Sequence, residues 1–313
     1  MKRLLVKTLL FLALTFAVVL AANLRYVETN HWKKENNVWK FNFVPDDIQL
    51  ANFGSSHGEV GFKYDGFPQY TTFNFGLGSQ RYFWDYGILR QYADRFAPGA
   101  VVLLPVSYFG VTGRTNYDDL RPRYYRFLRR EYFDRWETME AVRYAQLPVL
   151  SAGTNLLKCI KDVPPEHIDV FTTRTTHLEG EELRRYCLNK HQQWTSPNQE
   201  GGEEGYLQNH AELCQLVAFC LERGLRPVLI TTPICTELND IYAKDEGFFP
   251  TFHRFIADVQ AQFPGLPYFD YSHDPEFSPK VELFADGDHL NAPGAELFTA
   301  RVVADLRKAG LLE

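Results

Sequence analysis

Two uninterrupted apolar segments constrain the fold of this chain more than any other feature. Residues 100–106 read Ala-Val-Val-Leu-Leu-Pro-Val, and residues 226–231 carry a second, similar run. Strands with one face in water alternate apolar and polar residues, whereas strands buried on both faces of a parallel sheet show continuous apolar runs. The pattern therefore predicts buried parallel strands at both places.

Strand and helix patterns alternate along much of the remaining chain. The other predicted strands are 47–53, 71–75 and 266–271. Four helices are predicted. The first is capped by Ser79 and ends at Pro98-Gly99, and the second ends just before Gly224. The third spans residues 252–263, and the fourth follows Asn291 as its cap. This alternation predicts an α/β protein, a three-layer α/β/α sandwich with a mainly parallel sheet. Ligands of such sheets bind at the carboxyl ends of strands, and Ser56, Gly78 and Ser107 each follow a predicted strand.

Residues 111–205 interrupt this alternation. The part between 114 and 135 is rich in arginine and aromatic residues, and the part at 189–205 has the composition of a loop. We predict a domain at 46–313 with a largely helical insertion at 111–205, which would cover the carboxyl edge of the sheet as a lid. Its arginines would either lie on a solvated helix whose aromatic residues enter the core, or form a surface for an anionic glycan, lipid headgroups or a membrane partner.

The N-terminus has the pattern of an export signal. Lys2, Arg3 and Lys7 precede or flank an apolar stretch at 9–22, which is typical of a secretory signal or a signal-anchor. We predict residues 1–25 as this segment and residues 26–45 as a polar, aromatic stalk. The alternatives are an uncleaved anchor, a cleaved signal peptide, and a buried helix of a cytoplasmic protein. The first two place the domain outside the cytoplasm.

Charge and composition argue against some classes of function. The net charge is −6 over 313 residues, whereas nucleic-acid binding needs a basic surface, so no nucleic-acid partner is predicted. The five cysteines are scattered without a Cys-x-x-Cys pair, and His167, His177, His191, His210 and His253 show no ligand spacing with a cysteine or an acid. We therefore predict buried thiols, with one disulfide left open, and neither a metal site nor another cofactor.

Two short segments near opposite ends of the chain carry residues suited to catalysis. Residues 54–57 read Gly-Ser-Ser-His after the first predicted strand, and residues 286–289 read Asp-Gly-Asp-His before the last helix. A serine on a tight turn, together with an aspartate and a histidine, supplies the parts of a Ser-His-Asp triad. The spacing favours Asp286 over Asp288 as the partner of His289, so one loop would hold both the base and the residue that orients it.

These segments resemble two sequence blocks of the SGNH/GDSL hydrolase superfamily. The first block of that family contains Gly-x-Ser, which matches Gly54 and Ser56, and the last contains Asp-x-x-His, which matches Asp286 and His289. The resemblance implies a flavodoxin-like SGNH fold in which Ser56 is the nucleophile. Asp286 and His289 would be its catalytic partners.

The two middle blocks depart from the family pattern. The second block contains Asn74, which is an auxiliary candidate. Ser79 stands where the family has the glycine whose amide helps to bind the oxyanion. This role would pass to the amide of Ser79 or of Gly78. In the third block Ser107 stands where the family has asparagine, and its hydroxyl could donate one hydrogen bond. The implied oxyanion donors are the Ser107 hydroxyl and the backbone N–H groups of Ser56, Gly78 and Ser79.

The resemblance covers residues 46–110 and 225–310. The Gly-Ser-Ser variant and the anchor are similar to a branch that includes the D-alanine transfer protein of teichoic acid synthesis and the alginate acetylation proteins. We expect an extracytoplasmic, bacterial serine acyl-esterase or O-acyltransferase that acts on an acylated glycan or envelope polymer through an acyl-Ser56 intermediate. The membrane, through the N-terminal segment, and a membrane-bound acyltransferase are candidate partners. His57 would donate a hydrogen bond near the acyl group, or have a structural or surface role.

Two other functions stay open at this point. One is a lipase- or thioesterase-like SGNH enzyme acting on acyl lipids, which an apolar insertion facing Ser56 would favour. The other is a catalytically weak, membrane-anchored binding or assembly factor on the same fold, which the serine at position 107 favours.

Overall fold

The computed structural model describes residues 1–114, 117–162, 174, 176–196 and 201–313. Contacts divide the chain into two compact units, one formed by Met1–Phe43 with Tyr117–Val170 and the other by Val44–Asn116 with Phe171–Glu313. The predicted 46–313 domain with a single insertion at 111–205 does not match this division. Within that insertion, Tyr117–Val170 group with the N-terminal segment, whereas the residues from Phe171 onward belong to the unit that contains the sheet.

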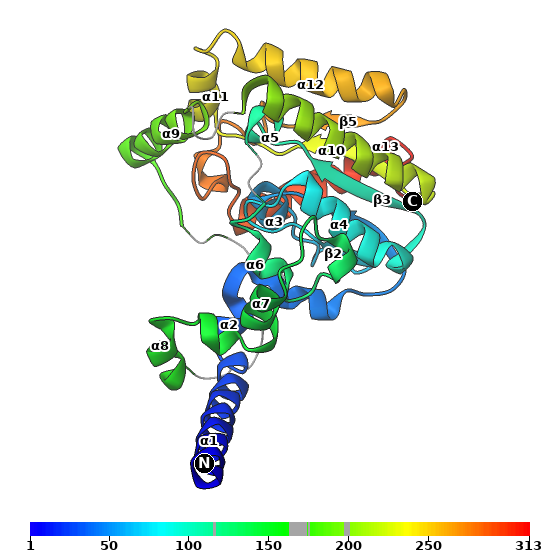
Figure 1. The fold of residues 1–313 in the computed structure, drawn as a ribbon. Coiled ribbons are helices and arrows are strands. Elements are labelled where there is room, and N and C mark those ends of the chain that lie inside the picture. The colour runs from blue at the N-terminus through cyan, green and yellow to red at the C-terminus, as the bar shows by residue number, and fades with distance from the viewer. Residues whose placement is uncertain (115–116, 163–173, 175, 197–200) are drawn as a thin grey trace. The chain divides into compact units, whose positions relative to one another are not determined.

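A five-stranded parallel sheet forms the centre of the second unit, which confirms the predicted α/β fold class (Figure 1). The strands lie in the order β2-β1-β3-β4-β5 and every neighbouring pair is parallel. Their bounds are β1 Ile48–Asn52, β2 Thr72–Asn74, β3 Phe96–Pro105, β4 Arg226–Thr231 and β5 Tyr268–Asp270. In this order the topological switch point lies between β1 and β3, where sheets of this type bind their ligands.

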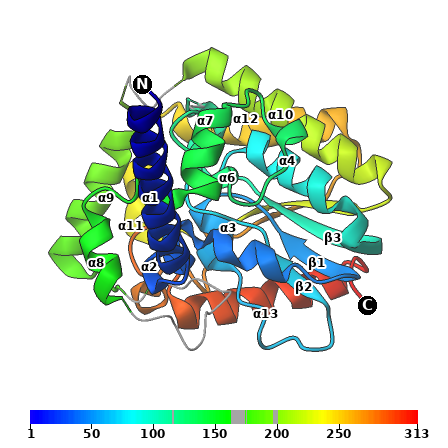
Figure 2. The ribbon, with the colours of Figure 1, turned by 60° about the horizontal axis from the view of Figure 1, so that its bottom comes forward.

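Helices cover both faces of the sheet. α4 (Tyr82–Tyr92) and α12 (Phe248–Gln262) both pack against α10 (Gly202–Glu222), whereas α3 (Ser56–Gly61) packs against α13 (Ala292–Lys308). Figure 2 shows the first group on one side of the sheet and α13 on the other. Residues 100–105 of β3 are all buried between these layers. The continuous apolar run is therefore the central strand, as its composition predicts.

Shorter elements complete this unit. They are α5 Phe109–Thr112, α9 Gly180–Trp194, α11 Thr236–Tyr242 and the 3₁₀ turns Ala93–Arg95 and Val281–Leu283. The prediction of a loop at 189–205 is wrong at both ends, because α9 continues to Trp194 and α10 begins at Gly202. Residues 197–200 of that prediction lie outside the described residues.

Three predicted element ends can be compared with the structure. Ser79 is exposed, has φ +59° and does not cap α4, which begins at Tyr82. Residues 98–99 lie inside the less buried first half of β3 rather than before it. Asn291 caps α13 as predicted, because its side chain accepts a hydrogen bond from the Gly294 N–H at 3.0 Å.

The N-terminal unit begins with α1 (Lys2–Val27), which among the described helices is the one long and apolar enough to cross a membrane. The mean hydropathy of its most apolar part is 2.5, and none of that part is buried. A signal sequence has the same properties, so the helix is compatible with either an anchor or a signal.

Residues 26–45, predicted as a stalk, fold into helical turns that pack against the segment after residue 117. Phe41 stacks on Phe127 with 3.7 Å between ring centroids. Arg126 lies 3.4 Å from the Trp32 ring centroid and donates hydrogen bonds to the carbonyls of Trp32 and Glu35. These contacts give Arg126 a structural role.

The elements of this unit after α1 are α2 Asn30–Lys34, α6 Arg121–Tyr124, α7 Thr138–Ala141, α8 Asn155–Lys161, the 3₁₀ segments Glu35–Phe43, Arg130–Tyr132 and Pro148–Ser151, and the π-helix Val142–Gln146.

Candidate active site

A sharp turn after β1 places Ser56 at the start of α3. Gly54 has φ +98°, and a Cβ atom at this position would lie 3.1 Å from the Pro105 side chain, so glycine suits the turn. The Gly54 N–H donates to Asp85 Oδ1 at 2.9 Å, which ties the turn to α4. Ser56 itself is half-buried. This strand–turn–helix geometry is the one that presents a serine nucleophile at the edge of a sheet.

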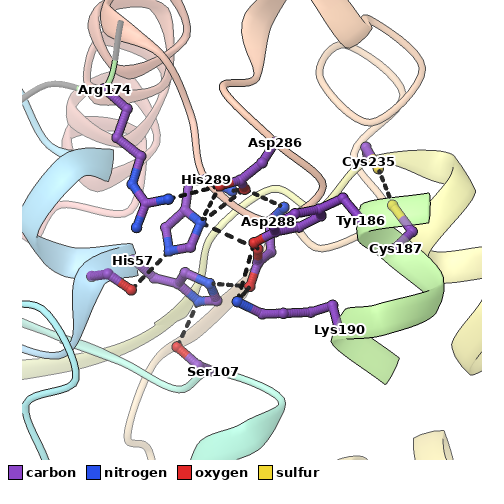
Figure 3. A network of polar contacts seen from close by, with 11 residues as sticks. His57, Ser107, Arg174, Tyr186, Cys187, Lys190, Cys235, Asp286, Asp288 and His289 are labelled. Carbon is purple, nitrogen blue, oxygen red and sulfur yellow. Dashed lines mark hydrogen bonds and ion pairs between the residues drawn. The ribbon is translucent and has the colours of Figure 1, made fainter. Parts of the chain in front are cut away.

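The structure brings together the three residues predicted to form a triad, of which Asp286 and His289 are labelled in Figure 3. His289 Nε2 lies 2.8 Å from Ser56 Oγ. On the other side of the ring, His289 Nδ1 lies 2.8 and 3.0 Å from the two carboxylate oxygens of Asp286. Asp286 and His289 are both buried. The distances are those of a hydrogen-bonded nucleophile, base and orienting carboxylate.

Further contacts hold the Asp286 carboxylate in place. Its Oδ1 accepts hydrogen bonds from the backbone N–H groups of Asp288 and His289 at 3.1 and 3.0 Å. Arg174 donates to its Oδ2 at 2.7 Å. Three donors besides the imidazole therefore fix the position of the carboxylate that orients His289.

A second buried carboxylate, Asp288, lies beside the triad. Asp288 Oδ1 is 3.2 Å from His289 Nδ1, farther than Asp286, and accepts a hydrogen bond from Tyr186 at 2.8 Å. Its Oδ2 lies 3.0 Å from Lys190 Nζ and 3.1 Å from His57 Nε2. Tyr186 and Lys190 are not among the residues predicted from the sequence, although their i, i+4 spacing places both on one face of a helix.

These charges set the protonation of the two histidines. Burial disfavours the imidazolium form of His289, but the neighbouring Asp288 and Asp286 carboxylates outweigh it and raise the pKa of His289. Burial lowers the pKa of His57. Burial raises the pKa of Asp288. The nearby charges of His289 and Lys190 outweigh this effect and hold the pKa well below its usual range. His57 is therefore neutral and Asp288 is ionised near pH 7.

The residues predicted to bind the oxyanion lie in different surroundings. The Leu77 N–H donates to the Gly54 carbonyl at 3.1 Å, which holds the loop after β2 against the nucleophile turn. In this loop Gly78 is half-buried and Ser79 is exposed. Ser107 Oγ lies 2.7 Å from His57 Nδ1, so its hydroxyl is engaged by a histidine rather than open toward Ser56.

Asn74, predicted as an auxiliary residue, has a structural environment. Its side-chain amide donates to the carbonyls of Gly58, Glu59 and Phe62 at 3.0, 3.0 and 3.1 Å. Its Oδ1 accepts from the Gly76 N–H at 2.9 Å. These bonds satisfy the backbone at the end of the short helix α3, which fixes the helix that carries Ser56.

Two buried cysteines support the loop between Asp286 and His289. Cys187 Sγ and Cys235 Sγ are 4.0 Å apart, and the Cys235 N–H donates to the Gly287 carbonyl at 3.0 Å. A Cβ atom on Gly287 would lie 2.7 Å from Cys187 Sγ. Glycine is therefore needed here for α9 to approach the loop. The four cysteines whose side chains are described are buried free thiols.

His57, Asp288 and His289 also have the arrangement of a candidate metal site. One ligand atom from each lies within 4.8 Å of the others. In the structure, however, Asp288 is ion-paired with Lys190 at 3.0 Å, and a serine hydroxyl bonds one nitrogen of each histidine. A cation would have to displace these contacts, so the geometry favours the hydrogen-bonded arrangement.

No family model matches the chain, and no curated protein matches it either. The functional interpretation therefore depends on the geometry of the site.

Proposed function

We propose that this protein is a serine acyl-esterase or O-acyltransferase whose nucleophile is Ser56. The observation that carries the proposal is the continuous hydrogen-bonded series from Ser56 Oγ to His289 (2.8 Å) and from His289 to Asp286 (2.8 Å). It lies at the carboxyl end of β1, next to the switch point of the parallel sheet.

The proposed reaction uses each of these residues in one role. Ser56 Oγ attacks the ester carbonyl and His289 Nε2 takes its proton, while Asp286 stabilises the resulting imidazolium. The imidazolium then protonates the departing alcohol, which leaves an acyl-Ser56 ester. Water or a sugar hydroxyl attacks this ester in the second half, with His289 again as the base, and the acyl group is released or transferred.

We also propose that the chain is a member of the SGNH/GDSL superfamily, and the strand order and the site support this proposal. Residues 54–56 and 286–289 carry the matching blocks, and the flavodoxin-like order places the first block after β1. The third block departs from that family's pattern, because Ser107 replaces the asparagine and its hydroxyl is hydrogen-bonded to His57.

The apolar helix α1 and the charges beside the triad support a proposed location and substrate class. We propose that α1 anchors the protein to a bacterial membrane with the sheet unit outside the cytoplasm, where a membrane-bound acyltransferase could supply acyl groups. Arg174 lies beside the triad carboxylate Asp286 and is 39% exposed, and Lys190 lies beside the neighbouring carboxylate Asp288. Charged groups at this place favour a polar acylated glycan or envelope polymer over an acyl lipid.

Covalent labelling tests the proposal. The full chain in detergent is treated with a fluorophosphonate, and the adduct is located by intact-mass and peptide mass spectrometry. We expect one adduct on Ser56 that the Ser56→Ala variant lacks, whereas Ser196→Ala, a change in the turn after α9, labels like the wild type. A folded wild-type chain that takes no label on Ser56 would contradict the proposal.

The labelling rate should depend on pH in a defined direction. Neutral His289 is the form that accepts the Ser56 proton, and its pKa is raised by Asp288 and Asp286 against the effect of burial. The rate should therefore fall on acidification with a midpoint above about 6.5, the usual imidazole value. Asp288→Asn removes one negative charge and should move the midpoint to lower pH. A rate profile that Asp288→Asn leaves unchanged would show that the carboxylate does not tune the base.

A further inference from the structure

A second Ser-His-Asp arrangement lies beside the triad. Ser107 Oγ is 2.7 Å from His57 Nδ1, and His57 Nε2 is 3.1 Å from Asp288 Oδ2 (Figure 3). The rings of His57 and His289 stand edge to face with their centroids 5.1 Å apart. Ser107 follows β3 and Ser56 follows β1, so the two serines flank the switch point from neighbouring strands.

The Ser107 proton points toward His57. Asp288 is ionised, so the hydrogen between it and His57 must belong to Nε2. Because burial keeps the His57 ring neutral, its Nδ1 carries a lone pair and Ser107 Oγ must be the donor at 2.7 Å. A hydroxyl that donates to a histidine oriented by a carboxylate is the arrangement of an activated serine nucleophile.

Two contacts from α9 hold this second carboxylate. Tyr186 donates to Asp288 Oδ1 at 2.8 Å, and Lys190 Nζ lies 3.0 Å from Oδ2. Both contacts favour the ionised carboxylate that the arrangement requires.

A small cavity of about 20 Å³ adjoins Ser107. Its lining includes Ser55, Tyr82 and Asn209. Ser55 Oγ, the Tyr82 hydroxyl and Asn209 Oδ1 are buried and have no hydrogen-bond partner among the residues that the structure describes. Buried polar atoms are rarely left without a partner, and a cavity of this size has room for about one water or one oxygen atom. Two hydroxyl donors beside an activated serine suit the carbonyl oxygen of an acyl group.

We propose that Ser107, His57 and Asp288 form a second nucleophilic site, which carries a short acyl group as an ester on Ser107. The bond between Ser107 Oγ and the acyl carbon forms, and the C–O bond of the donor ester breaks. The Ser107 proton passes to His57 Nδ1 and from there to the departing alkoxide. The carbonyl oxygen occupies the cavity at Ser55 and Tyr82, which has room for about one oxygen atom. The donor ester is a small acetate ester or acyl-Ser56.

Peptide mapping tests this site. The full chain in detergent is treated with p-nitrophenyl acetate, quenched in acid and digested, and acetylated peptides are quantified by mass spectrometry. We expect acetyl groups on Ser107 in the wild type, none at this position in Ser107→Ala, and acetylation of Ser107 about 100-fold slower in His57→Gln. Ser107→Cys retains a nucleophile of similar size and should be acetylated at position 107, which provides a result even if Ser107→Ala does not fold.

The Ser56→Ala variant identifies the donor and separates the two proposals. Acetylation of Ser107 in this variant shows that the small ester reacts directly, whereas acetylation only with Ser56 present shows transfer from acyl-Ser56; both results support the second site. An acetyl group on Ser56 but never on Ser107 overturns the second site and leaves the proposed function standing. An acetyl group on Ser107 in both the wild type and Ser56→Ala supports the second site whether or not acyl-Ser56 accumulates, and the role of Ser56 is then decided by its fluorophosphonate labelling.

Discussion

Replacing His289 with alanine is expected to slow fluorophosphonate labelling of Ser56 by about 10³-fold, within the usual range for removal of a general base. The physical reason is that His289 Nε2, at 2.8 Å, is the group positioned to accept the Ser56 proton. The measurement is the second-order labelling rate at Ser56, followed by intact mass. His253→Ala, on α12, is the matched histidine control and should label at the wild-type rate.

Asp286→Asn provides the second arm of this test. An amide in place of the carboxylate can stabilise the wrong tautomer of His289 and leaves the imidazolium without its charge partner, so labelling should again fall by orders of magnitude. A His289→Ala variant that is folded and labels within tenfold of the wild type would show that Ser56 is not activated by this histidine.

Replacing Gly58 with alanine is expected to lower the free energy of unfolding by about 3 kcal/mol. Alanine normally stabilises a helix relative to glycine by up to about 1 kcal/mol. Here, however, the added Cβ would lie 2.0 Å from the backbone oxygen of Phe53, which is the residue after β1 and cannot move away as a side chain can. The steric cost should therefore exceed the propensity gain and displace α3 with Ser56.

Chemical denaturation of the full chain in detergent measures this change. Gly66→Ala is the matched control, because a Cβ atom on Gly66 meets nothing within 4 Å, and it should unfold like the wild type. Equal stability of the two variants would show that the turn between β1 and α3 accommodates a side chain at residue 58.

Local sequence patterns determined the frame of the sheet unit. The apolar residues 100–105 and 227–230 became the buried parts of β3 and β4, because positions covered on both faces of a sheet need apolar residues. Asn291 capped the last helix, because a cap depends on a hydrogen bond only three residues away. Ser56 and His289 are 233 residues apart, and their proximity was predicted only because their segments resemble two blocks of one family, not from a local pattern.

Contacts between distant segments were decided only by the tertiary structure. His57 and Asp288 are separated by 231 residues, and Tyr186 and Asp288 by 102. A pattern within one segment carries no information about such pairs, so the second carboxylate network and the engaged Ser107 hydroxyl could not be predicted. The same reason applies to the division of the chain, because residues 26–43 pack against partners after residue 117, such as Phe127 against Phe41. The sequence alone determined which residues can do chemistry at the edge of the sheet, whereas long-range packing decided which of them share protons.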